Sequence, residues 1–352
     1  MELIHGGDWA GFEKEYGKAP LDFSANISPL GLPASVKAAA IAALDTAERY
    51  PDPKCRALRA ALADYHGVGA ETIVCGNGAA ELIDRICHAL RPGRAAVFTP
   101  GFSEYARALR AVGCAVTEIG LSDGRDYRLT GEEAAQIPAD CGLVFLCNPN
   151  NPTGLLTERD TLREILNRCC RARGAVLVVD ECFLDFCEDP AAHSLTGALQ
   201  SYPGLIVLKA FTKTWAMAGL RLGYALCGSR ETAEKLQACG QPWAVSNIAQ
   251  AAGIAAMRER AYLDRLRALV TSERRRMAAA LTALGLRVIP GNANFLLVYS
   301  GDVFLAEKLR ERGILIRDCR NFAGLTAGWY RVAVRTASEN DVLLREMEEA
   351  LG

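Results

Sequence analysis

Seven short apolar runs alternate with segments of helical periodicity between residues 72 and 227. The runs lie at residues 72–75, 94–98, 115–119, 142–147, 175–180, 205–209 and 223–227. Strands interleaved with helices predict an α/β fold with a largely parallel sheet. The runs are nearly continuous in apolar residues, which is typical of strands covered by helices on both faces. We therefore expect ligand-binding side chains in the loops that follow the carboxyl ends of these strands.

Residues 1–33 precede this core and differ from it in composition. They contain HGG at residues 5–7 and LDFSANISPLG at residues 21–31, and they are rich in Pro, Gly and Asn. Such a composition predicts an N-terminal arm without regular secondary structure, which we expect to wrap around the core.

The pattern changes again after Gln241. Helical segments cover about residues 246–284, apolar strands follow at 293–299 and 330–335, and a last helix begins near Ser338. Together they predict a smaller α+β domain. The expected division is an arm at 1–33, a large domain at 34–240 and a small domain at 241–352.

The balance of charge and the cysteine spacing argue against several kinds of partner. Lys plus Arg (40) nearly equals Asp plus Glu (41), so the chain lacks the basic character that nucleic acid requires. No apolar run approaches the ~18 residues of a membrane span, and the first residues lack a basic leader, so we expect a cytosolic protein without membrane contact. The thirteen cysteines lack paired metal-ligand spacing, which predicts no metal site.

A Thr-Lys pair, Thr212 and Lys213, follows the apolar run at residues 205–209. A lysine that leaves a buried strand can face a pocket, where burial and a cation such as Arg221 both disfavour its ammonium form. The free amine can form a Schiff base with an aldehyde, which makes it a covalent catalyst. Most single lysines are solvated instead, so this interpretation depends on the residues around it.

Gly76, Asn77 and Gly78 follow the first predicted strand and open a helical segment. Free backbone N–H groups and the helix dipole at such a position can bind a phosphate. The same three residues are also a turn signal. A hairpin would need a second strand directly afterwards, whereas the next segment has helical periodicity.

Three more side chains follow predicted strands. Asn151 lies in CNPNNPTG at 147–154, whose prolines stiffen the loop and aim the amide, although the loop can equally be a structural turn. Asp180 ends a buried strand, where a carboxylate needs a cation, such as a protonated pyridine nitrogen, or caps the next element. Phe102 can stack on a flat ring or simply pack in the core.

These features follow one another as phosphate loop, aromatic ring, Asn turn, acidic strand end, lysine and, eight residues beyond the lysine, Arg221. Together they indicate pyridoxal phosphate as the cofactor. A carboxylate such as Asp180 keeps the ring nitrogen of this cofactor protonated, so that the ring accepts electrons while the protein selects the bond that breaks.

Arginines mark a candidate substrate site. In YRVAVR at 330–335, strand alternation places Arg331 and Arg335 on one face. Arg317 ends the apolar run at 313–316 and can converge on the same site. Arginines in this arrangement suit a substrate with both a carboxylate and a phosphate, although a solvated strand edge would give the same pattern.

Over nearly its whole length the chain resembles the fold-type I pyridoxal-phosphate enzymes, the aspartate aminotransferase superfamily. Within it, the chain is similar to the histidinol-phosphate aminotransferase group and, more narrowly, to the threonine-phosphate decarboxylases of cobalamin biosynthesis. The segments that carry this resemblance are HGG at 5–7, LDFSANISPLG at 21–31, RYPDP at 49–53, TPGFSEYARAL at 99–109, DECFLDF at 180–186 and ILIRDC at 314–319. The resemblance implies a seven-stranded, mostly parallel sheet in the large domain, the cofactor pyridoxal phosphate and a homodimer.

The resemblance also implies roles for individual residues. Lys213 would bind the cofactor and act as the catalytic residue. Around the cofactor ring, Asp180 would pair with the nitrogen, Asn151 would meet the hydroxyl and Phe102 would stack. The cofactor phosphate would contact Asn77, Gly78, Ala79, Thr212 and Arg221, with Tyr50 reaching across from a second subunit. The substrate would contact His5, Gly6, Asn26 and Arg317 through its phosphate and Arg331 through its carboxylate.

Two positions depart from the family pattern. Ala210 stands where many relatives have Ser or Thr beside the cofactor phosphate, which predicts weaker cofactor binding. Phe183 replaces the Tyr that aminotransferases place near the ring hydroxyl, and this change favours a decarboxylase.

The function that the resemblance implies is decarboxylation of L-threonine O-3-phosphate to aminopropanol phosphate. The runner-up is histidinol-phosphate aminotransferase, because residue spacing does not show which Cα bond stands perpendicular to the ring. A decarboxylase of serine phosphate is a further alternative, since one methyl group in an apolar site is worth only ~1–3 kcal/mol. Outside enzymes, the alternative is a ligand-sensing domain, but such domains follow a DNA-binding domain, whereas this arm begins at residue 1.

Overall fold

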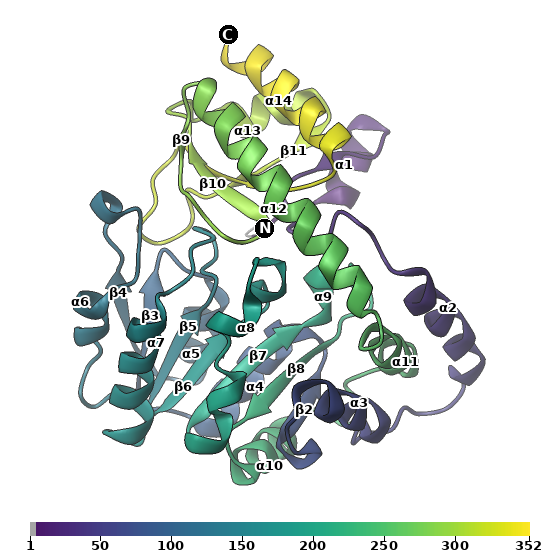
Figure 1. The fold of residues 1–352 in the computed structure, drawn as a ribbon, viewed down its shortest axis with the longest axis vertical. Coiled ribbons are helices and arrows are strands. Elements are labelled where there is room, and N and C mark those ends of the chain that lie inside the picture. Colours follow the sequence, from purple (N-terminus) through teal and green to yellow (C-terminus); the bar gives the residue numbers. More distant parts are fainter. Residues whose placement is uncertain (1–4) are drawn as a thin grey trace.

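The computed structural model describes residues 5–352, which form three sheets and the helices around them. Figure 1 shows the largest sheet with helices on its faces and a smaller unit of strands and helices at the other end of the molecule. The long helix α12 (Arg260–Ala283) connects the two ends.

The largest sheet has seven strands in the order β2-β8-β7-β6-β5-β3-β4. They are β2 (Ile73–Gly76), β3 (Arg94–Thr99), β4 (Ala115–Gly120), β5 (Leu143–Cys147), β6 (Val176–Asp180), β7 (Leu205–Ala210) and β8 (Gly223–Cys227). Only β8 is antiparallel to its neighbours in this sheet. The prediction of seven strands in a largely parallel sheet is therefore confirmed.

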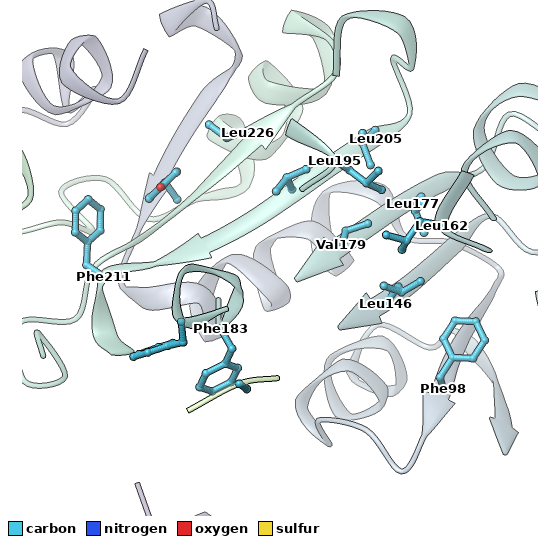
Figure 2. Close-up of a cluster of buried hydrophobic side chains, with 14 of the residues drawn as sticks. Phe98, Leu146, Leu162, Leu177, Val179, Phe183, Leu195, Leu205, Phe211 and Leu226 are labelled. Carbon is cyan, nitrogen blue, oxygen red and sulfur yellow. The ribbon is translucent and has the colours of Figure 1, made fainter. Parts of the chain in front are cut away.

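Different helices bury the two faces of this sheet. In β6, Val178 packs on the side of α4 (Gly78–Leu90), α5 (Glu104–Ala111) and α10 (Arg230–Cys239). Its neighbours Leu177 and Val179 face the opposite side, where they belong to a second cluster with side chains of α3 (Arg56–His66) and α7 (Arg159–Leu166). Figure 2 shows part of this second cluster. Burial on both faces explains why the strand has no polar alternation.

The smaller unit is built on an antiparallel sheet in the order β12-β13-β10-β9. Its strands are β9 (Arg287–Val288), β10 (Phe295–Tyr299), β12 (Arg317–Asp318) and β13 (Trp329–Ala333), and its helices include α13 (Leu305–Glu311) and α14 (Ala337–Leu351). A capping box between Thr336 and Glu339 fixes the start of α14. The strands and the last helix expected after Gln241 are thus confirmed.

The arm contains more regular structure than its composition predicts. Helix α1 (Trp9–Tyr16) begins where the Asp8 side chain accepts a hydrogen bond from the Gly11 N–H, and β1 (Leu21–Asp22) pairs with β11 (Ile314–Leu315). The buried Phe12 ring packs on Tyr16. The expectation of no regular structure is therefore wrong here, because capping and tertiary pairing outweigh the Pro and Gly content.

The predicted domain limits at 33/34 and 240/241 stay a prediction. Helix α11 (Asn247–Ala256) lies beyond the second limit, yet it packs against α2 (Ala34–Ala43) and α3 in the large unit. The remaining short helices are α6 (Gly131–Ala135), α8 (Pro190–His193) and α9 (Phe211–Thr214). Among the helices of residues 5–352, none is long and apolar enough to cross a membrane.

Candidate active site

A cavity of about 320 Å³ lies at the carboxyl ends of β5, β6 and β7, where the large sheet, the small sheet and the arm meet. The predicted residues that line it are His5, Gly6, Asn26, Ala79, Phe102, Asn151, Asp180, Thr212, Lys213, Arg221, Arg317 and Arg331. A larger cavity of about 640 Å³, bordered by α3, α7 and residues 190–198, contains none of the predicted site residues. The first cavity is therefore the candidate active site.

Lys213 lies in α9, a single helical turn that starts directly after β7. Burial, followed by the positive charge of Arg331, lowers the pKa of the Lys213 amine to about 8. Arg221 acts in the same direction but more weakly, so the main cationic neighbour is Arg331 rather than the predicted Arg221. At pH 7 about a tenth of such an amine is neutral and nucleophilic.

We expect the reactivity of Lys213 to titrate near pH 8. In the protein without cofactor, the rate of acetylation by acetic anhydride should rise with pH to a midpoint near 8, because only the neutral amine reacts. Arg331→Gln should move this midpoint to higher pH, since it removes a positive charge. Mass spectrometry of the labelled peptides measures the rates, with the exposed Lys235 as internal reference. A midpoint unchanged by Arg331→Gln would contradict the role of that charge.

Asp180 is buried at the end of β6, and both of its carboxylate oxygens are fixed. Oδ1 accepts a hydrogen bond from the Cys182 backbone N–H (3.0 Å), and Oδ2 accepts one from the Tyr105 hydroxyl (2.6 Å). The first bond is the capping interaction that the sequence allowed as an alternative role for Asp180. Both hydrogen-bond donors are neutral, so the negative charge of the carboxylate can still pair with a cation bound in the cavity.

Phe102 and His5 form one wall of the cavity. Their rings lie 5.9 Å apart between centroids, and the His5 Nε2 atom is 3.0 Å from Glu104 Oε1. Glu104 and Phe102 thus hold His5 at the cavity. Gly6, the next residue of the HGG segment, is packed against the Ser24 backbone, where a side chain would not fit.

The turn from β2 into α4 brings Arg221 against Gly78. Gly78 has φ +81°, and a Cβ at this position would lie 2.6 Å from Arg221 Nη2, so only glycine admits the guanidinium here. Ala79, in the first turn of α4, lines the cavity together with Arg221, which gives a helix N-terminus and a cation suited to an anion. The Asn77 N–H instead donates to Glu81 Oε2 (3.1 Å), and neither Asn77 nor Gly78 lines the cavity.

Asn151 and Arg331 contact each other inside the cavity. Arg331 Nη1 donates to Asn151 Oδ1, and Arg331 Nη2 donates to the Ser24 carbonyl of the arm (3.0 Å). Among residues 5–352, Arg331 Nε and both polar atoms of the Asn26 side chain are buried without a partner. Buried polar atoms are normally satisfied, so these orphaned groups fit a site that receives a polar ligand.

Arg317 lines the same cavity from β12. Its guanidinium lies over the Phe322 ring and donates to Asn321 Oδ1 (2.7 Å). Arg335 does share the arm-facing side with Arg331, since it donates to the Asp22 carbonyl, but it pairs with Glu339 and does not line the cavity. The convergence predicted for the arginines therefore holds for Arg317 and Arg331.

Tyr50 lies outside this cavity. Its side chain is 80% exposed and stacks on Trp243 with 4.6 Å between ring centroids. Within one chain it therefore contributes nothing to the site, and its assignment to the site of a neighbouring subunit stays a prediction.

The sequence analysis missed eight lining residues: Ser24, Ala25, Ala80, Glu104, Tyr105, Cys147, Cys182 and Phe322. The signal for Tyr105 was its position three residues after Phe102, at the start of the helical segment that follows. Most of the others lie within two residues of a predicted site residue in the sequence, whereas Phe322 does not and depends on tertiary contacts. No cluster of three or more metal-ligating side chains occurs in the described part of the chain.

The residues of the cavity fit pyridoxal phosphate. A lysine of lowered pKa, a buried carboxylate and an aromatic ring line the cavity. The helix N-terminus beside Arg221 suits a phosphate, and the orphaned atoms of Asn26 and Arg331 suit further polar groups.

Comparison with known proteins gives a consistent result. The profile of the family "Aminotransferase class I and II" matches residues 18–347. A threonine-phosphate decarboxylase of Salmonella typhimurium is 40% identical over 99% of this chain and 96% of its own length. Histidinol-phosphate aminotransferase 1 of Cupriavidus pinatubonensis is 32% identical over 93% of this chain and 87% of its own. The crystal structure of the histidinol-phosphate aminotransferase of Clostridium acetobutylicum superposes with a TM-score of 0.88, at 28% identity, over 94% of this chain and 98% of that one.

Proposed function

The chain belongs to the class I and II aminotransferase family, and we propose that within this family it decarboxylates L-threonine O-3-phosphate to aminopropanol phosphate, a step of cobalamin biosynthesis. The similarity to the Salmonella typhimurium decarboxylase supports this choice, because it extends over both chains almost completely. The enzyme depends on pyridoxal phosphate, as its family does.

The observation that carries the proposal is the presence of two buried arginines in one cavity with Lys213. Burial, and among the charges around it that of Arg317, lowers the pKa of Arg331 to about 10. Burial also lowers the pKa of Arg317. Two desolvated cations that repel each other are stabilised by an anionic ligand. A substrate with a carboxylate at Arg331 and a phosphate at Arg317 provides both charges.

When bound, the cofactor would serve as an electron sink for the bond that breaks at Cα, and different side chains of the protein would bind its different parts. Lys213 would attach it, Asp180 would pair with its ring nitrogen, Asn151 would contact its hydroxyl and Phe102 would stack on its ring. Thr212, Arg221 and the turn Asn77, Gly78 and Ala79 would hold its phosphate, and of this turn Ala79 lines the cavity. Arg331 orients the substrate carboxylate, while His5, Gly6, Asn26 and Arg317 hold the substrate phosphate. With a pKa near 8, the Lys213 amine can carry the proton that Cα takes up when carbon dioxide leaves.

Histidinol-phosphate aminotransferase is the second candidate, because several relatives carry that name. Phe183 argues against it, since its ring packs edge-on against Phe295 (5.1 Å between centroids) and brings no hydroxyl to the cavity. The test is to incubate the protein with cofactor and threonine O-phosphate, serine O-phosphate, or histidinol phosphate plus 2-oxoglutarate. Carbon dioxide from threonine phosphate supports the proposal, whereas glutamate formed only from histidinol phosphate contradicts it.

A homodimer and a cytoplasmic location are part of the proposal. Tyr50, Trp243, Ile41 and Leu44 leave large apolar side chains exposed, which a second copy of the chain would cover. All thirteen cysteines have free thiols, which suits a reducing compartment.

Mixing two inactive variants should restore activity if Tyr50 completes the partner's site. In a mixed dimer of Tyr50→Phe and Lys213→Ala, one of the two sites contains both native residues. An equal mixture should therefore regain about a quarter of wild-type activity, because half of the dimers are mixed and each has one site. Steady-state assays after subunit exchange measure this. No recovery, with exchange verified and the Tyr50→Phe parent impaired, would argue against a shared site.

A further inference from the structure

Tyr105 has no role in the function described so far, although it is one of the most constrained side chains in the cavity. It lies in the first turn of α5 and is 3% exposed. Its ring stacks on Phe145 of β5, with 4.8 Å between centroids and 7° between planes. It also meets the Phe102 ring edge-on at 5.5 Å. Packing from two sides fixes the direction in which its hydroxyl points.

That hydroxyl donates to Asp180 Oδ2 at 2.6 Å, a short bond of the kind formed with a charged acceptor. Burial, and then the charge of Asp180, raises the pKa of Tyr105 well above its ordinary value, so the phenol stays protonated and acts as a donor. The Cys182 N–H occupies the other oxygen. Both carboxylate oxygens of Asp180 therefore accept a hydrogen bond from the protein.

We propose that Tyr105 is a positioning residue that acts through Asp180 and keeps the shared proton on the cofactor ring nitrogen rather than on the carboxylate. A carboxylate that already accepts two hydrogen bonds is a weaker proton acceptor than one that accepts a single bond. The ring therefore retains its positive charge, which it needs as an electron sink. This inference rests on the cofactor site of the proposed function.

Tyr105→Phe tests the inference, because it removes the hydroxyl and keeps the ring that stacks on Phe145. The dissociation constant of pyridoxal phosphate should rise about 10- to 100-fold, the range for loss of a hydrogen bond to a charged group. The turnover number should fall while KM for the substrate stays within about twofold, since Tyr105 is not assigned to the substrate. In the holoenzyme with ¹⁵N-labelled cofactor, the ring nitrogen resonance should move toward that of an unprotonated pyridine.

The matched control is Tyr224→Phe, which removes another buried tyrosine hydroxyl, one that lies 2.8 Å from His66 Nε2 and outside the cavity. It should leave cofactor affinity and the ¹⁵N resonance unchanged. Phe145→Leu keeps the Tyr105 hydroxyl but removes its stacking partner, so it should shift the resonance in the same direction by a smaller amount. This second variant also provides a test if Tyr105→Phe folds poorly.

A double-mutant cycle decides whether Tyr105 acts through Asp180. In an Asp180→Asn background, Tyr105→Phe should change cofactor affinity by less than about twofold, because the charged acceptor is already gone. A full effect in that background, or an unmoved ring resonance in the single variant, would overturn the inference. Failure of the wild-type protein to bind pyridoxal phosphate would overturn the proposed function as well, so the two failures are distinguishable.

Discussion

Lys213→Ala should lower turnover about a thousandfold, because it removes both the covalent attachment of the cofactor and the group that carries the proton to Cα. The wild-type protein should be yellow when loaded, and borohydride should fix the cofactor on the peptide that contains Lys213. In the variant, borohydride should fix none. Absorbance spectra and mass spectrometry of the digested protein measure both effects.

The conservative variant Lys213→Arg separates the effect of the positive charge from the effect of the reactive amine. It retains a cation but has no amine that can be neutral at pH 7, so it should be as inactive as Lys213→Ala. Added methylamine should partly restore Lys213→Ala and should not restore Lys213→Arg, whose side chain fills the space. Cofactor fixed by borohydride on another lysine would refute the assignment.

Arg317→Ala should lower kcat/KM for threonine O-phosphate by about thirtyfold to several thousandfold. Loss of a buried partner for the substrate phosphate costs roughly 2–5 kcal/mol, and each ~1.36 kcal/mol corresponds to tenfold in rate. The cofactor spectrum should not change, since Arg317 is assigned to the substrate alone. Steady-state kinetics with threonine O-phosphate and with unphosphorylated threonine measure the effect.

Arg335→Ala is the matched control, because Arg335 faces the same side as Arg331 but pairs with Glu339 outside the cavity. It should leave the ratio of the two kcat/KM values unchanged. Arg317→Ala should reduce that ratio strongly. If Arg317→Ala weakens both substrates equally, the phosphate assignment is wrong and Arg317 has a structural role or binds the carboxylate.

The cavity residues that follow strands were predictable from the chain itself. Asn151, Asp180 and Lys213 come after apolar runs, and the carboxyl ends of neighbouring parallel strands share one edge of a sheet. The large sheet was predictable for the same reason, since its strands are continuous apolar runs. Local sequence patterns are therefore sufficient to predict a part of the fold in which a strand and a helix alternate repeatedly.

Residues on the arm could not be derived in this way. Asn26 reaches the cavity because β1 pairs with β11 and because the Asn294 side chain donates to the Asn26 carbonyl. Both contacts join segments nearly three hundred residues apart, and composition carries no signal for them. His5 and Asn26 were therefore named by family resemblance alone.

The electrostatics of the site also depended on tertiary contacts. Arg221 is close to Lys213 in sequence and was the expected cation, but Arg331 has the larger effect on the Lys213 pKa. The hydrogen bond between Tyr105, at the start of α5, and Asp180, at the end of β6, was likewise not predicted from the sequence. Sequence spacing identified the chemical groups, whereas packing determined which groups act on each other.

Decarboxylation is tested most directly by mass spectrometry and NMR of the product formed from threonine O-phosphate in D₂O, without any keto acid. The expected product is aminopropanol phosphate that has lost the carboxylate and carries a single non-exchangeable deuterium at the former Cα, because that carbon takes up one solvent-derived proton when carbon dioxide leaves. A keto product with its carboxylate intact, or substrate that exchanges its α-hydrogen without releasing carbon dioxide, would contradict the assigned function.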